Sequence, residues 1–198
     1  SGVFVIDIGG GTTDMAVVTQ GAMSQTETVK AAGNALDDAI VRYMKNEHQV
    51  LIGVRTAEEI KKAIGCAVPR KETVTMTAKG RSLETGLPKL LEVSSDEICT
   101  CMQGVLGEIT AAAKMLFERT SPQLVADITS GEVLLTGGSA ALFGMDTLLA
   151  DALGLDVRVV NEPELCVAKG ACVALNKMHV LDRYGYQFQA RGLPRFFL

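Results

Sequence analysis

One segment constrains the fold of this chain more than any other: DIGGGTTD at residues 7–14, which stands between two apolar runs. Residues 3–8 are apolar and rich in β-branched side chains, and this composition predicts a buried strand that ends in a glycine turn. Residues 15–18 predict a second strand and residues 26–30 a third. The links between these runs are too short for a helical crossover, so we expect antiparallel hairpins.

The DIGGGTTD segment has the chemistry of a phosphate-binding loop. Its glycines let backbone N–H groups approach an anion without Cβ atoms in the way. These glycines are Gly9, Gly10 and Gly11. Thr12 and Thr13 add hydroxyl donors, and Asp7 can hold a magnesium ion, directly or through water. Asp14 can orient an attacking water, so Thr12, Thr13 and Asp14 are the candidate catalytic residues. The alternative is a plain tight turn between strands.

Residues 35–93 predict a small α+β lobe inserted into a larger one formed by residues 1–34 and 94–180. A helix is expected over residues 35–47, because apolar residues recur on one face at helical spacing. Asp37 and Asp38 are expected in its first turn, where the helix dipole favours negative charge.

A second helix in this lobe is expected to begin at Thr56 and to stop at Gly65. Glu59 stands three residues after Thr56, which is the spacing of a capping box. Two strands are expected next, over residues 73–78 and 87–93, with a polar loop at 79–86 between them.

The longest predicted helix follows the capping-box segment 94–97 and ends at Arg119. A short helix restarts at Pro122, a residue suited to the first helical position. Residues 133–136 predict a buried strand that ends at Gly137 and Gly138 and is followed by Ser139. This turn can press its backbone against a purine or an α-phosphate. Further helices are expected at about 145–153 and 162–176, and a strand at 157–160.

The two glycine motifs together resemble the second phosphate motif and the adenosine motif of the actin, heat-shock-chaperone and sugar-kinase superfamily. Three further stretches are similar to the MreB family of bacterial actin-like proteins: LIGVRTAEEIK at 51–61, GLPK at 86–89 and LFERTSP at 116–122. The similarity covers about residues 3–176 and resembles the C-terminal half of that family only. It implies an α/β fold of the actin and heat-shock-chaperone type, also called ribonuclease-H-like, with a small inserted α+β subdomain.

The resemblance also implies a nucleotide site that uses ATP and Mg²⁺. Asp7 would lie by the magnesium, and Gly9 to Thr13 would surround the phosphates. Further nucleotide contacts are implied at Gly33, Asn34, Glu59, Lys62, Gly137, Gly138 and Ser139. Asn34 departs from the family pattern, which has an acid at this position. Glu59 as a capping residue and Lys62 as a solvated surface lysine are the structural alternatives.

Charge and cysteine content limit the other functions. The net charge is −4 and no basic stripe occurs, so nucleic acid is not an expected partner. The five cysteines form no paired C-x-x-C pattern, which favours a reducing cytoplasm over a disulfide framework. The chain starts inside an apolar strand, and we expect a fragment of a longer protein. The aromatic tail at 181–198 is expected to pack on the body or to be disordered, and contact with a membrane is the alternative.

The function that the resemblance implies is the ATP-binding half of a cytoskeletal filament protein. In that family, protomers self-associate into filaments at the inner membrane, work with membrane adaptors and guide cell-wall synthesis. The first phosphate loop, the catalytic glutamate and the membrane-anchoring segment belong to the N-terminal half, so this chain alone is expected to hydrolyse ATP poorly. The alternatives are a chaperone nucleotide-binding domain of the heat-shock or reactivase type, a sugar kinase and a pure binding module.

Overall fold

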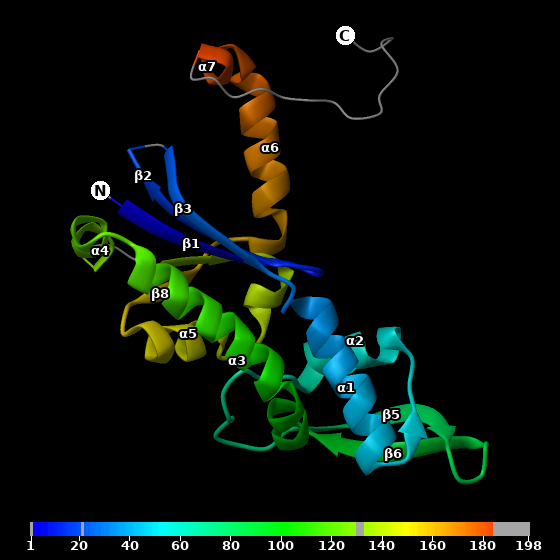
Figure 1. The fold of residues 1–198 in the computed structure, drawn as a ribbon. Helices are drawn as coiled ribbons and strands as arrows, with labels where there is room; N and C mark the ends of the chain where they lie inside the picture. Colours follow the sequence, from blue (N-terminus) through cyan, green and yellow to red (C-terminus); the bar gives the residue numbers. More distant parts are fainter. Residues whose placement is uncertain (1, 21, 130–132, 184–198) are drawn as a thin grey trace, which may run out of the picture. The chain divides into compact units, whose positions relative to one another are not determined.

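The computed structural model describes residues 2–20, 22–129 and 133–183. The chain forms two compact units, residues 1–164 and 165–198, which are described separately (Figure 1). The described part of the second unit holds two helices, α6 (Cys166–Asn176) and α7 (Met178–Arg183). A short 3-10 turn, η2 (Pro163–Leu165), precedes α6. Most of the predicted tail, residues 184–198, lies outside the described residues.

A five-stranded sheet forms the centre of the first unit, in the order β3-β2-β1-β7-β8. Its strands are β1 (Gly2–Ile8), β2 (Thr13–Thr19), β3 (Ala22–Val29), β7 (Val133–Thr136) and β8 (Val157–Val159). The first three strands pair antiparallel through short turns, as the sequence predicts. Strand β7 pairs parallel with β1, and β8 pairs parallel with β7. This order brings the ends of β1 and β7, which carry the two glycine motifs, next to each other.

Three helices pack against this sheet: α3 (Ser95–Arg119), α4 (Pro122–Thr129) and α5 (Met145–Leu153). Alternate residues of β1 are fully buried beneath them, because successive side chains of a strand point to opposite faces. The helices contribute long apolar faces at 3.6 spacing to the same core. The largest fully buried side chains of the strands and α3 are Phe4, Ile6, Ile8, Ile98, Met102, Leu106 and Ile109.

A second, three-stranded sheet has the order β4-β5-β6 and is antiparallel throughout. Its strands are β4 (Val50–Leu51), β5 (Thr75–Ser82) and β6 (Pro88–Ser94). The predicted loop at 79–86 is wrong in its first half, because β5 continues to Ser82 and pairs with both neighbours. The short strand β4 is not apparent in the sequence. The predicted subdomain boundaries, residues 1–34 with 94–180 against 35–93, stay a prediction.

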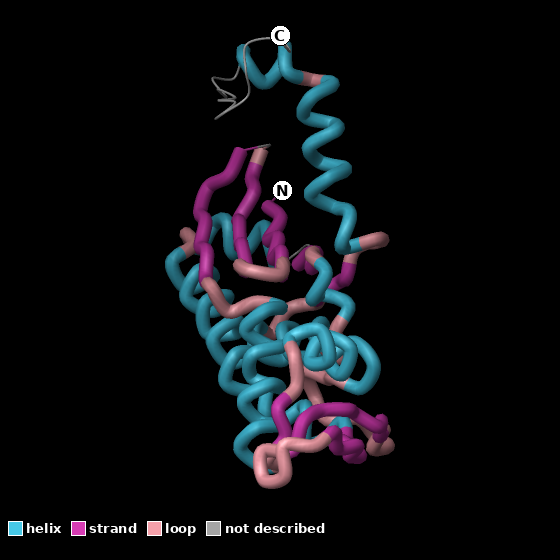
Figure 2. The backbone as a smooth tube through the Cα atoms, turned by 90° about the vertical axis from the view of Figure 1, so that its right-hand side faces the viewer, coloured by secondary structure: helices cyan, strands magenta, loops and turns pink. Residues whose placement is uncertain are grey.

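Helices α1 (Gly33–Glu47) and α2 (Val54–Ile64) pack against each other and against α3. Figures 1 and 2 show them between the two sheets of the first unit. Both begin two residues earlier than predicted. Helix α1 starts at Gly33, so Asp37 lies in its second turn and is buried instead of facing solvent.

The predicted capping box of α2 is wrong. The residue before the helix is Gly53, which has no side chain to form a cap, and Thr56 lies inside the helix. The burial of Ala57, Ile60 and Ile64 determines which face of this helix packs against the core. Gly65 ends the helix as predicted, and its N–H donates to the carbonyl oxygen of Lys61 at 3.0 Å.

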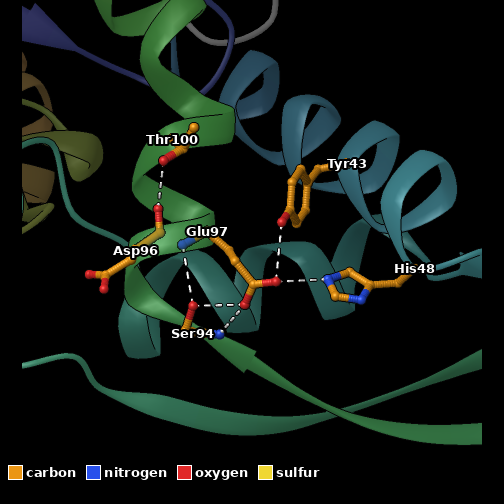
Figure 3. A network of polar contacts seen from close by, with 6 residues as sticks. All are labelled: Tyr43, His48, Ser94, Asp96, Glu97 and Thr100. Carbon is orange, nitrogen blue, oxygen red and sulfur yellow. Dashed lines mark hydrogen bonds and ion pairs between the residues drawn. The ribbon is translucent and has the colours of Figure 1, made fainter.

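The predicted capping box at the start of α3 is confirmed, and it extends into a network that joins α1 to α3 (Figure 3). Ser94 Oγ accepts from the Glu97 N–H, while Glu97 Oε2 accepts from the Ser94 N–H at 2.8 Å. The other oxygen of Glu97 lies 3.1 Å from the Tyr43 hydroxyl and 3.0 Å from His48 Nε2. One carboxylate therefore caps α3 and holds the last turn of α1.

Candidate functional site

Residues 9–12, here called the phosphate loop, connect β1 to β2. The loop closes on itself, because the Gly9 N–H donates to the carbonyl oxygen of Thr12 at 3.0 Å. Asp7 and Asp14 face each other as register partners in the two strands. The local sequence requires this turn: two apolar strands must reverse direction within four residues, and the glycines permit it.

Hydrogen bonds to β2, to β3 and to the segment after β3 hold the hydroxyl groups of Thr12 and Thr13 and the carboxylate of Asp14. Thr12 Oγ1 donates to Asp14 Oδ2 at 2.9 Å, and Thr28 Oγ1 donates to Asp14 Oδ1 at 2.7 Å. Thr13 is fully buried, and its hydroxyl donates to the carbonyl oxygen of Ala31 at 2.6 Å. Thr13 thus supports the frame of the loop, and its predicted catalytic role stays a prediction without support from this placement.

Asp7 lies at the end of β1, opposite Thr136 of β7. Burial raises the pKa of Asp7 above its usual value, and the negative charge of Asp14 raises it further. Gly137 follows directly, with φ of +89°, and a Cβ atom there would lie only 2.4 Å from Asp7 Oδ1. Only glycine therefore allows the backbone of the second motif to approach this carboxylate so closely.

The start of α1 lies directly against the phosphate loop. The Gly33 N–H donates to the carbonyl oxygen of Gly9 at 3.0 Å, and the Asn34 N–H donates to that of Gly10 at 2.7 Å. Gly33 leaves no room for a side chain, since a Cβ atom would lie 2.7 Å from Ser139 Oγ. Ser139 belongs to η1 (Gly138–Ala141), and its hydroxyl donates to the same Gly9 carbonyl at 3.2 Å. Three separate segments therefore meet at one glycine loop.

A cavity of about 550 Å³ opens beside these contacts. This volume lies within the range of small-molecule sites, about 300–1,000 Å³. Predicted site residues that line it are Gly9, Gly10, Gly33, Asn34, Lys62, Gly138 and Ser139. Predicted site residues outside its lining are Asp7, Gly11, Thr12, Thr13, Asp14, Glu59 and Gly137. The structure thus brings both glycine motifs to one cavity, and Asp7 and Gly137 lie just behind its glycine lining.

Helix α2 forms one wall of the cavity with Glu58, Lys61 and Lys62. Lys62 Nζ lies 2.6 Å from Glu58 Oε1, an exposed pair on one helix face. Glu59 instead pairs with Arg55 at 3.3 Å and points away from the lining. Successive helical residues lie about 100° apart, so Glu58 lines the cavity while the predicted Glu59 lies on the neighbouring face.

Sequence reasoning missed a second group of lining residues. Lys61 Nζ lies 2.8 Å from Asp37 Oδ1 of α1, and both side chains are nearly buried. At another part of the lining, the Arg70 guanidinium stacks 4.1 Å from the centroid of the Phe143 ring and donates to the Gly65 carbonyl oxygen. Lys61 directly follows the apolar residue Ile60 in the sequence. This adjacency was the signal that could have identified Lys61 as a partly buried lysine.

The donor set at the loop fits a hydrated magnesium ion better than an ion caged by protein. Among the described residues, no group of three or more His, Cys, Asp or Glu side chains is arranged to hold a metal. Mg²⁺ keeps several waters and commonly takes one or two carboxylates plus phosphate oxygens. Asp7 supplies one partly buried carboxylate beside the loop, and a nearby cation would relieve its repulsion with Asp14.

The sequence matches the family described as MreB/Mbl protein over residues 1–183. It is 41% identical over 183 residues to the cell shape-determining protein Mbl of Bacillus subtilis (strain 168), covering 92% of this chain and 55% of Mbl. It is 37% identical over 185 residues to the cell shape-determining protein MreB of Escherichia coli (strain K12), covering 93% of this chain and 52% of MreB. The chain thus spans about half the length of these curated relatives.

The fold is similar to that of MreB5 of Spiroplasma citri, with a TM-score of 0.87 and 33% identity. The match to its crystal structure with ADP covers 92% of this chain and 55% of that chain. The match to its structure with AMPPNP, also at a TM-score of 0.87, covers 93% and 56%. These similarities confirm the predicted fold class, an actin-like α/β ATPase domain.

Proposed function

The chain belongs to the MreB/Mbl protein family, and on this premise we propose that it is the nucleotide-binding half of an actin-like filament protein that determines cell shape. The observation that carries the proposal is the cavity where both glycine motifs meet α1 and α2. The relatives are cell shape-determining proteins, which favours this function over the heat-shock chaperone alternative.

The nucleotide would lie along the cavity with its phosphates at the phosphate loop. Backbone N–H groups of a glycine loop suit an anion, and no side chain blocks their approach. The nucleoside would extend along α2, between Glu58 with Lys62 on one side and Leu142 with Phe143 on the other. The bound ADP and AMPPNP of Spiroplasma citri MreB5 support adenine nucleotides as ligands.

Asp7 is the residue that we assign to magnesium. A bound Mg²⁺ would neutralise phosphate charge and orient the phosphate chain. Asp7 would hold the hydrated ion from the end of β1, and Gly137 would leave the space for this approach. Burial and the charge of Asp14 both raise the pKa of Asp7, so a cation would be favoured beside the ionised carboxylate.

Hydrolysis requires groups on both sides of the γ-phosphate. This chain supplies one side, where Thr12 and Asp14 are exposed at the loop and remain the proposed water-orienting residues. The relatives are about twice as long, and we propose that their further residues complete the reaction. The chain alone is then a binding half with little turnover.

Filament formation, contact with membrane adaptors and cell-wall synthesis proteins, and a location at the cytoplasmic side of the inner membrane are proposed from the family. Among the described helices, none is long and apolar enough to cross a bilayer. Membrane contact is proposed to come through the half of the relatives that this chain does not match.

The test is calorimetric titration of the chain with MgADP and MgAMPPNP. The discriminating variant is Gly138→Leu, because a Cβ atom there meets no protein atom within 4 Å and the side chain would occupy space at the cavity that Gly138 lines. Gly107→Leu is the matched control: a Cβ atom there also meets no protein atom within 4 Å, but Gly107 lies on the exposed surface of α3.

We expect wild type and Gly107→Leu to bind MgADP with equal affinity and Gly138→Leu to bind at least about tenfold more weakly, the loss of about 1.4 kcal/mol. Equal affinity in all three proteins, or no binding by the wild type, would refute a nucleotide site in this cavity.

A further inference from the structure

Helix α2 carries two adjacent lysines whose surroundings differ. Lys62 is 71% exposed and forms its ion pair with Glu58 of its own helix. The Lys61 side chain is 11% exposed, and its Nζ lies 2.8 Å from Asp37 Oδ1, whose side chain is 5% exposed. Lys61 and Asp37 therefore form a nearly buried ion pair between α2 and α1.

Such a pair is not explained by stability alone. Taking two charges out of water costs about as much as their attraction returns, and replacing a buried pair by apolar residues is often neutral. Burial raises the pKa of Asp37 above its usual value, although the hydrogen bond and charge of Lys61 act in the opposite direction. The desolvation cost is thus only partly offset, which calls for a second role.

Lys61 makes a second contact that supplies this role. Its Nζ donates to the carbonyl oxygen of Gly33 at 3.0 Å. The N–H of the same Gly33 donates to the carbonyl oxygen of Gly9, and the next N–H, of Asn34, donates to that of Gly10. A continuous series of polar contacts therefore runs from α2 through one glycine peptide to the phosphate loop.

This series of contacts has little freedom to move. Gly33 is packed so closely that a Cβ atom would lie 3.1 Å from the Gly9 carbonyl oxygen and 2.7 Å from Ser139 Oγ. Asp37 lies one helical turn beyond Gly33 and holds the ammonium from the other side. The lysine ammonium therefore lies between an ion-pair partner on α1 and a backbone acceptor in the residue that touches the loop.

We propose that Lys61, oriented by Asp37, is a positioning residue that sets the phosphate loop at the correct distance from α2. The inference rests on the proposed nucleotide site and adds to it a coupling between its two ends. Through Lys61, the wall along which the nucleoside lies and the loop that receives the phosphates form one rigid frame. Rigid placement of both ends lowers the entropy lost when a nucleotide binds.

The test separates this role from a purely structural one by replacing both charges. Asp37→Leu with Lys61→Met keeps the buried volume apolar and removes the bond to Gly33. Asp38→Leu with Lys45→Met is the matched control, because it makes the same kind of replacements at two exposed positions of α1 that do not line the cavity. Unfolding by urea, amide hydrogen exchange at Gly33 and Asn34 without nucleotide, and MgADP titration are measured for each.

We expect the double variant to unfold at the same urea concentration as the wild type. Its Gly33 and Asn34 amides should exchange at least tenfold faster, and its dissociation constant for MgADP should rise at least tenfold. Asp38→Leu with Lys45→Met should stay within about threefold of wild type in both measurements. If the double variant does not fold, Asp37→Asn with Lys61→Met, which keeps a polar group at position 37, takes its place with the same expectations.

Wild-type exchange rates or wild-type MgADP affinity in the double variant would overturn the positioning role. The proposed function is contradicted by a different result, namely that the wild type itself binds no MgADP. In that case the exchange rates of Gly33 and Asn34, which need no ligand, still decide whether Lys61 holds the loop.

Discussion

At the scale of single residues, the site depends on how a few charges are placed. Asp7 is kept near another carboxylate by the register of β1 and β2, and this proximity, together with burial, opposes its ionisation. Tyr43 is also held in its neutral form. Burial raises the pKa of its hydroxyl, and the hydrogen bond that it donates to the Glu97 carboxylate raises this pKa further. For both residues the folded pKa is raised, so each makes the free energy of unfolding fall as the pH rises through that pKa.

Asp7→Asn tests the charge at the end of β1. The folded pKa of Asp7 is raised above its ordinary value, so its contribution to stability is present below about pH 4 and is lost as pH rises through the folded pKa. We therefore expect the variant to lose less stability than wild type between pH 4 and pH 7 in urea unfolding. Its MgADP affinity should fall by about tenfold or more, the size of one charge-assisted contact.

Asp38→Asn is the control for Asp7→Asn, because Asp38 is exposed. It should match wild type in the pH dependence of urea unfolding and in MgADP affinity. An Asp7→Asn protein that binds MgADP as tightly as wild type would show that Asp7 holds no magnesium.

Tyr43→Phe tests the network in Figure 3. Burial, and then the hydrogen bond and charge of Glu97, raise the pKa of Tyr43 to about 12 from its usual 10.0. The contribution of the neutral hydroxyl is complete below pH 10 and is lost as pH rises towards 12. Wild type should therefore lose more stability than Tyr43→Phe across this interval, measured by urea unfolding. Parallel pH curves for the two proteins would contradict the assignment.

At the scale of elements, helix ends carry much of the organisation. Helix α3 begins with a complete capping box, in which Ser94 and Glu97 satisfy each other's backbone N–H groups. Helix α1 begins with glycine and has no side-chain cap, because its first N–H groups donate to the carbonyl oxygens of the phosphate loop. The start of α3 is therefore stabilised by its own residues, whereas the start of α1 forms part of the candidate site.

Ser94→Ala tests the locally stabilised end. The Glu97 N–H would lose its acceptor, and the free energy of unfolding should fall by about 1 kcal/mol. Thr100→Ala is the control, since the Thr100 hydroxyl donates only to the Asp96 carbonyl oxygen inside the same helix and is exposed. Its effect should stay within about 0.5 kcal/mol in the same urea series. Equal effects of the two substitutions would mean that the cap adds nothing.

At the scale of the whole molecule, the chain has an actin-like fold and spans about half the length of its curated relatives, so the proposed nucleotide site has one wall. A one-sided site can bind a nucleotide but lacks groups across the γ-phosphate. Where a second wall closes over a bound nucleotide, binding energy can be converted into a change of shape.

Turnover and sedimentation test this division of labour. We expect the 198-residue chain to bind MgATP with no steady phosphate release, and a protein of the relatives' full length to release phosphate and to pellet with MgATP. In that longer protein, a leucine in place of Gly138 should abolish nucleotide-dependent pelleting, while one in place of Gly107 should not. Steady turnover by the chain alone would overturn the one-sided site.

The amino-acid sequence alone determined the features whose causes are local. The apolar, β-branched run at 3–8 and the glycines at 9–11 determined the β1–β2 hairpin, and the capping box determined where α3 begins. The strand at 133–136 was also predictable to the residue, because an apolar run ends there at two glycines. Each of these depends on contacts within a few positions along the chain, so no distant partner is needed to recognise it.

Only the tertiary structure decided which residues face the cavity. The rotation of α2 follows from burying Ala57, Ile60 and Ile64 against distant helices, and this turns Glu58 and Lys61 inwards and Glu59 outwards. The partnership of Lys61 with Asp37 joins residues 24 positions apart on two helices. A one-residue offset changes the direction of a helical side chain by about 100°, and packing between elements, not local pattern, sets that angle.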